Sequence, residues 1–63
     1  MWYFRVVELG GGGWACRHGR QVLDTHPELD NAIEHITTVA SAQRPATLLL
    51  HRLDGTIDEL EVL

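Results

Sequence analysis

One segment of this chain has the spacing of an amphipathic helix, and that single helix limits what the other segments can form. Apolar residues recur every three or four positions and make one stripe: Leu29, Ala32, Ile33, Ile36, Val39 and Ala40. A helix buries such a stripe against a neighbouring layer, so one helix covers only one face of a sheet. Because the other segments are typical of strands, we expect an α+β fold with one helix on one sheet face.

Local signals place this helix at about residues 26–43. Thr25 and Glu28 have the spacing of a capping box, and Pro27 stands in the first turn, where its missing N–H costs nothing. Pro45 ends the helix, because the residue before a proline is biased toward extended backbone.

Strands are expected at about residues 2–9, 14–23, 46–52 and 57–63, where β-branched and aromatic residues or leucines are frequent. Four consecutive glycines, residues 10–13, separate the first two strands, and Asp54-Gly55 is a hairpin signal between the last two. The segment 18–20, His-Gly-Arg, is interpreted as a bulge or tight turn within the second strand. The order β-β-α-β-β then predicts one domain, residues 1–63, with a four-stranded, mostly antiparallel sheet.

Composition excludes several classes of protein. The hydrophobic fraction of 44% and the charged fraction of 22% are ordinary for a soluble globular domain. No apolar run is long enough to span a bilayer, and no secretory signal is recognised, so we expect a cytoplasmic protein without membrane contact. Cys16 is the only cysteine and cannot form an internal disulfide, while a net charge of -4 disfavours nucleic-acid binding.

No set of residues has the spacing of a catalytic or metal site. The four histidines, His18, His26, His35 and His51, show no metal-ligand spacing, and Cys16 with His18 would chelate only weakly. Neither Cys16 nor the only serine has a base and an oxyanion hole in reach, and the glycine run has no following lysine as a phosphate-binding loop would. We therefore expect no enzyme, no catalytic residue, no cofactor and no metal.

The sheet face left bare by the helix is the best candidate for function. A chain of about 60 residues buries only about 60% of its unfolded surface, and this one has no disulfide to compensate. We expect a structural or protein-interaction module that forms a homo-oligomer, most simply a dimer, or docks on a larger protein. Aromatic and arginine residues of the first two strands form the candidate interaction face: Trp2, Tyr3, Phe4, Arg5, Trp14 and Arg17.

The alternative is a small nucleic-acid-binding or antitoxin-like regulatory protein. Arg5 and Arg17, interleaved with Tyr3 and Trp14, would suit a sheet that stacks the bases of a single strand. The absence of lysine and the net negative charge favour self-association instead.

The order of these motifs resembles domain-of-unknown-function family 2188, a small bacterial domain. The resemblance rests on Tyr3 to Val7 with Trp14, on Asp24-Thr25 before Ala32-Ile33, and on the segment 50–57, Leu-His-Arg-Leu-Asp-Gly-Thr-Ile. It implies the β-β-α-β-β layout, a bacterial origin and no assigned activity. His51 matches the family's position just before the hairpin, and we expect His51, Asp54 and Gly55 to be structural residues of the last hairpin, with His51 holding the turn by hydrogen bonds. The acidic tail (Asp58, Glu59, Glu61) departs from the basic tail of the family and weakens any nucleic-acid role. A fainter similarity links the first hairpin and the helix start to HicB-like antitoxins.

Overall fold

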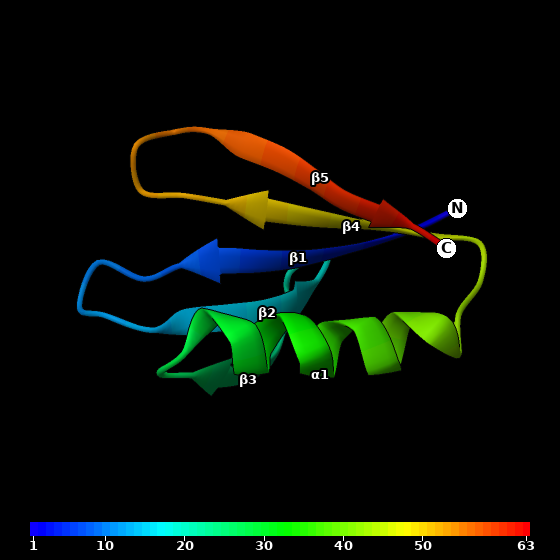
Figure 1. Ribbon diagram of the computed structural model, residues 1–63, viewed down its shortest axis with the longest axis horizontal. Coiled ribbons are helices and arrows are strands. Elements are labelled where there is room, and N and C mark those ends of the chain that lie inside the picture. The colour runs from blue at the N-terminus through cyan, green and yellow to red at the C-terminus, as the bar shows by residue number, and fades with distance from the viewer.

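Five strands form one sheet, and the single helix lies along one of its faces (Figure 1). The computed structural model describes all of residues 1–63. In chain order the elements are β1 (Trp2–Glu8), β2 (Trp14–His18), β3 (Gln21–His26), α1 (Leu29–Ser41), β4 (Ala46–His51) and β5 (Ile57–Val62). The helix is not long and apolar enough to cross a membrane.

The sheet is mixed, with strand order β3-β2-β1-β4-β5. Neighbouring strands are antiparallel except for the central pair, in which β1 and β4 run parallel. Strands β3 and β5 are therefore the two edges, and β1 is paired on both sides.

The prediction of four mostly antiparallel strands is wrong in one respect, the segment 14–23. The chain reverses at Gly19-Arg20, so this segment ends one strand, β2, and begins another, β3, which pairs back on it. Because β3 is antiparallel to β2, it runs in the same direction as β1, and the helix then returns the chain to the end of the sheet where β1 begins. Strand β4 consequently runs parallel to β1, as a crossover connection requires.

The predicted apolar stripe of the helix is confirmed except at Ile33, which lies outside the core cluster, and the predicted start of the helix is wrong. Ala32, Ile36 and Ala40 are buried, whereas the helix begins only at Leu29 and its N-cap is Glu28, without a side-chain cap. Thr25 does not close a capping box, because its backbone is extended in β3 opposite Ala15 of β2.

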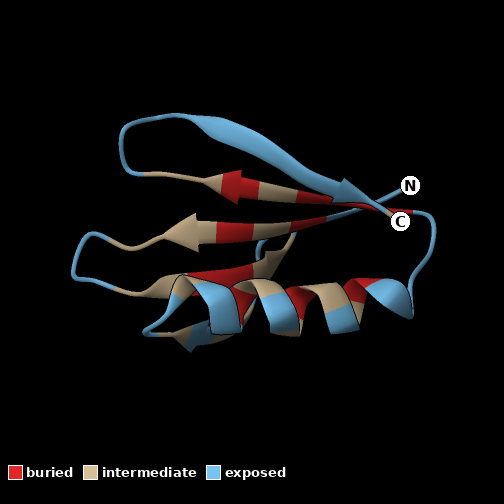
Figure 2. Cartoon of the chain, viewed as in Figure 1, coloured by how far each residue is buried: buried red, intermediate tan, exposed pale blue.

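The hydrophobic core lies between α1 and the three strands β1, β2 and β4 (Figure 2), and Leu23 of β3 packs against its margin. Alternate residues of the strands point toward the helix, as their pairing shows: Phe4 opposite Leu48 and Val6 opposite Leu50 and Cys16. All five of these residues are at most 2% exposed. Strand β5 lies beyond the helix and every one of its residues is exposed.

The Asp54-Gly55 hairpin is confirmed between β4 and β5. Gly55 has φ +88°, and its N–H donates to the carbonyl oxygen of Arg52 at 3.0 Å. Asp54 Oδ1 accepts hydrogen bonds from the Thr56 hydroxyl at 2.7 Å and from the Thr56 N–H at 2.9 Å, and these bonds lower the pKa of the Asp54 carboxyl.

We expect Gly55→Val to lower the free energy of unfolding by about 1–3 kcal/mol, because a β-branched residue is strained at positive φ. Urea denaturation followed by circular dichroism measures the loss. Gly11→Val is the matched control, since Gly11 is not at positive φ and a Cβ atom there would meet nothing within 4 Å. Equal stability of the two variants would contradict the turn geometry.

Candidate functional site

The six residues expected to share one interaction face lie on two opposite faces of the sheet. Trp2, Phe4 and Trp14 are on the side of the helix: Phe4 is 2% exposed, and Trp14 packs against the same core. Trp2 stacks on Phe4 with ring centroids 6.2 Å apart and lies 4.9 Å from the ring of His18. These three aromatic residues therefore belong to the core and its margin, not to a surface with the arginines.

Tyr3, Arg5 and Arg17 lie on the other face, which no helix covers. We call this surface the open face. Alternate residues of a strand share a face, and paired residues of neighbouring strands lie on the same face. The strand pairing therefore gives the members of the open face: Tyr3, Arg5, Val7, Ala15, Arg17, Val22, Thr25, Thr47, Leu49, His51, Ile57, Glu59 and Val62.

Large apolar side chains are exposed on the open face, notably on its two edge strands. The exposed fraction is 48% for Tyr3, 54% for Val22, 59% for Ile57 and 57% for Val62. Between them, the smaller side chains of Ala15 and Thr47 are buried by their neighbours. An apolar surface of this kind is typical of a face that meets a partner.

Charges on the open face are separated by strand. Arg5 of β1 lies directly opposite Arg17 of β2, and neither arginine forms an ion pair within the chain. Like charges in this position destabilise a sheet. On the other side of Arg5, Leu49 of β4 separates it from Glu59 of β5, which also has no ion pair. The open face thus has a basic half and an acidic edge.

The last hairpin does not use His51 as predicted. His51 Nε2 is buried without a hydrogen-bond partner, so its ring does not hold the turn. Besides Asp54, the turn is tied to β1 by Glu8, whose Oε1 accepts a hydrogen bond from the Leu53 N–H at 2.9 Å. Arg52 and Asp58 form an ion pair across the hairpin.

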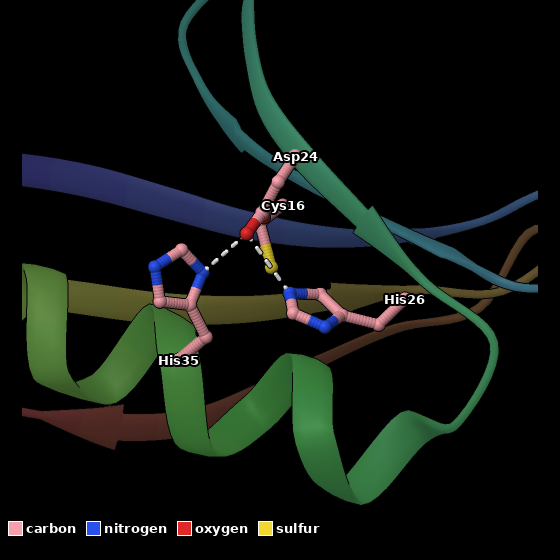
Figure 3. Close-up of side chains that lie close together, drawn as sticks. All are labelled: Cys16, Asp24, His26 and His35. Carbon is pink, nitrogen blue, oxygen red and sulfur yellow. Dashed lines mark hydrogen bonds and ion pairs between the residues drawn. The ribbon is translucent and has the colours of Figure 1, made fainter.

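A second group of side chains, which sequence spacing did not indicate, lies under the start of the helix (Figure 3). It consists of Cys16 from β2, Asp24 and His26 from β3, and His35 from α1, and we call it the Cys16 cluster. Asp24 Oδ2 is 3.0 Å from His26 Nε2 and 2.8 Å from His35 Nδ1. Burial, with the charge of Asp24 beside it, raises the pKa of the Cys16 thiol to about 12.

His18, the histidine nearest to Cys16 in the sequence, is not part of this cluster. Its ring stacks on Phe4 at a centroid distance of 4.9 Å, further along β2. The only signal that could have indicated the cluster is the pairing of Cys16 with Asp24, which depends on the unrecognised strand β3.

Comparison with known proteins identifies a family but no function. No curated protein and no solved structure matched the chain. One family model matches residues 4–60, from Phe4 in β1 to Leu60 in β5, and so includes the helix and parts of all five strands. The chain therefore belongs to the bacterial family described as "Uncharacterized protein conserved in bacteria", domain-of-unknown-function family 2188.

Proposed function

We propose that this protein is a non-catalytic interaction module that acts as a homodimer, with the open faces of two copies packed together. The observation that carries the proposal is the open face itself, which has exposed apolar side chains and unpaired charges of opposite sign on different strands. The helix covers only one face of the sheet, so apolar side chains on the other face are buried only when a second surface packs on them.

The small core of the single chain supports this proposal. Only 11 of its 63 residues are buried, and no disulfide adds to its stability. Small domains of this kind commonly obtain stability by oligomerisation. Contact between two open faces would remove the side chains of Tyr3, Ile57 and Val62 from water.

Charge complementarity favours one arrangement of the two copies. Packed sheets keep their strand directions within about 30° of each other. We place the two-fold axis between the two open faces, parallel to the strands and midway between β1 and β4. Given the strand order β3-β2-β1-β4-β5, β1 of one copy then packs on β4 of the other, and β2 packs on β5. Arg17 then faces Glu59 of the second copy, and Arg5 faces Leu49 of the second copy. Arg17 thereby gains an acidic neighbour across the interface, and the two-fold axis repeats this pair on both sides.

Sedimentation equilibrium over a hundredfold dilution tests the dimer. We expect twice the mass of one chain at the highest concentrations and a melting temperature that falls on dilution, because dissociation is coupled to loss of stability. The mass of one chain at every concentration, with a constant melting temperature, would refute the proposal.

A charge exchange tests the arrangement. Arg17→Glu and Glu59→Arg should each weaken the dimer about tenfold, because two exposed symmetric pairs are each worth about 0.2–1 kcal/mol and become repulsive. The double variant should recover most of the affinity. Glu61→Arg is the control, since Glu61 lies on the same strand but in register with Leu48, on the side of the helix. An equal effect of Glu59→Arg and Glu61→Arg would exclude this interface.

Single-stranded nucleic acid is the second candidate ligand of the open face, because Tyr3, Arg5 and Arg17 lie together there. The same variants separate the two functions. If nucleic acid binds, Glu59→Arg should strengthen salt-dependent retention on an oligonucleotide column, whereas the dimer proposal requires this variant to weaken self-association. The net charge of -4 favours the dimer.

A further inference from the structure

We propose that the Cys16 cluster is a zinc site, in which Cys16, Asp24, His26 and His35 together bind one Zn²⁺ ion. The site goes beyond the proposed dimer and is independent of it, since all four residues lie on the helix side of the sheet or on the helix.

Folding brings the four side chains together from three elements. Cys16 and Asp24 are paired residues of β2 and β3, His26 is the next residue of β3 on the same face, and His35 reaches them from α1 (Figure 3). One potential ligand atom of each residue, a sulfur, a carboxylate oxygen and two ring nitrogens, lies within 4.8 Å of the others.

Two buried polar atoms of the cluster lack hydrogen-bond partners, although Asp24 Oδ2 and His26 Nε2 lie within hydrogen-bond distance at 3.0 Å. Asp24 Oδ1 is buried and accepts no hydrogen bond, and His35 Nδ1 is close to Asp24 Oδ2 but makes no hydrogen bond with it. The Cys16 sulfur, which belongs to a fully buried residue, makes a long 3.4 Å contact to the carbonyl oxygen of Ala32 and also lies beside the Asp24 carboxylate. Buried polar groups without partners destabilise a fold, and a cation among these atoms would satisfy them.

The donor set indicates the metal. One thiolate, two imidazoles and one carboxylate are ligands that zinc accepts, and the negative thiolate and carboxylate neutralise a divalent ion. Tetrahedral zinc with bonds of about 2.0–2.3 Å places its ligand atoms roughly 3.3–3.8 Å apart. The present separations, 2.8 and 3.0 Å from Asp24 Oδ2 to the two histidine nitrogens and at most 4.8 Å between any two of the four atoms, are of this order. Calcium and magnesium are excluded by the sulfur and nitrogen ligands, because both ions prefer oxygen.

Binding replaces the proton of Cys16. The S–H bond breaks, a sulfur–zinc bond forms, and the proton passes to solvent, so binding should be stronger at higher pH. Solvent reaches the site through a surface hollow lined by His26, Asn31, Glu34, His35 and Thr38. His26 and His35 thus connect the buried sulfur to the surface, which gives the ion a path of entry.

The chemistry of such a site is structural. Four protein ligands complete the coordination of zinc and leave no position for substrate. The ion would connect β2, the edge strand β3 and the helix. Because β3 has no fully buried residue of its own, the ion would stabilise the attachment of this edge strand to β2 and to the helix.

Titration of the purified, metal-free chain with Zn²⁺ tests the proposal by isothermal calorimetry. We expect one ion per chain and a rise in melting temperature with zinc concentration. Co²⁺ should give the intense d–d bands of a tetrahedral site and a thiolate-to-metal band, which assigns Cys16 because the chain has no other cysteine. Absence of stoichiometric binding, or a cobalt complex without the thiolate band, would overturn the proposal.

Matched variants identify the ligands. Asp24→Asn and His35→Gln should each weaken zinc binding at least about 100-fold, since partners outside the ligand shell already contribute about 10- to 100-fold. Both side chains are partly exposed, so the metal-free variants should remain folded, and circular dichroism verifies this. Asp30→Asn and His51→Gln make the same chemical changes outside the cluster and should bind zinc normally. If all four variants bind zinc equally, the cluster is not the site.

Discussion

Replacement of Ile36 by alanine is expected to lower the free energy of unfolding by about 2–5 kcal/mol. Ile36 is 0% exposed and is among the largest fully buried side chains of the protein. It lies in the core cluster between α1 and the strands, where its loss leaves a cavity that the small domain cannot fill. At about 0.05–0.15 kcal/mol per residue, a chain of 63 residues is stable by only about 3–9 kcal/mol, so this loss is a large fraction of the total.

Ile33→Ala is the control for this prediction, because it removes the same atoms from the same helix. Ile33 is only partly buried and is outside the core cluster, so the loss should be clearly smaller than at Ile36. Urea denaturation followed by circular dichroism compares the two variants at equal protein concentration. Equal losses would show that the helix is rotated relative to the sheet.

Ile33 and Ile36 also show what helical spacing can and cannot predict. The spacing predicts one apolar stripe, and the structure confirms it, because amphipathic periodicity is a local property of the chain. It does not predict which members of the stripe lie at the centre of the contact. That depends on how the helix lies across the sheet, which is set by packing against distant strands.

The same distinction explains the missed strand. Gly19 correctly indicates an irregularity, but a bulge and a chain reversal have the same local sequence signal. Only the pairing of residues 21–26 with β2 decides between them. The chain reversal at Gly19 determines two further features: β1 and β4 pair in parallel, and the helix begins only after β3 has ended. Neither feature is predictable from a single strand over residues 14–23.

For the candidate sites, alternation predicts which residues share a strand face but not which face the helix covers. It correctly separates Trp2 and Phe4 from Tyr3 and Arg5, but a single interaction surface that contains all four is wrong, because the helix buries one side only. The Cys16 cluster has no sequence motif, because its residues come from three elements that only the tertiary fold brings together.

The second large effect is expected from Gly13→Ala in the loop between β1 and β2. Gly13 has φ +88°, and a Cβ atom there would lie 3.0 Å from the carbonyl oxygen of His26. Strain at positive φ costs about 1–3 kcal/mol, and displacement of a neighbouring backbone group adds to it. We expect a loss of about 2–4 kcal/mol in the free energy of unfolding, measured by urea denaturation.

Gly12→Ala separates the two contributions to this loss. Gly12 has φ +99° in the same loop, but a Cβ atom there would meet nothing within 4 Å, so this variant has the strain without the contact. The difference between the variants measures how tightly the first hairpin packs against the connection from β3 to the helix. If Gly12→Ala and Gly13→Ala lose the same stability, the contact with His26 contributes nothing. A larger loss at Gly13 means that the glycine is required where the hairpin meets the backbone of His26.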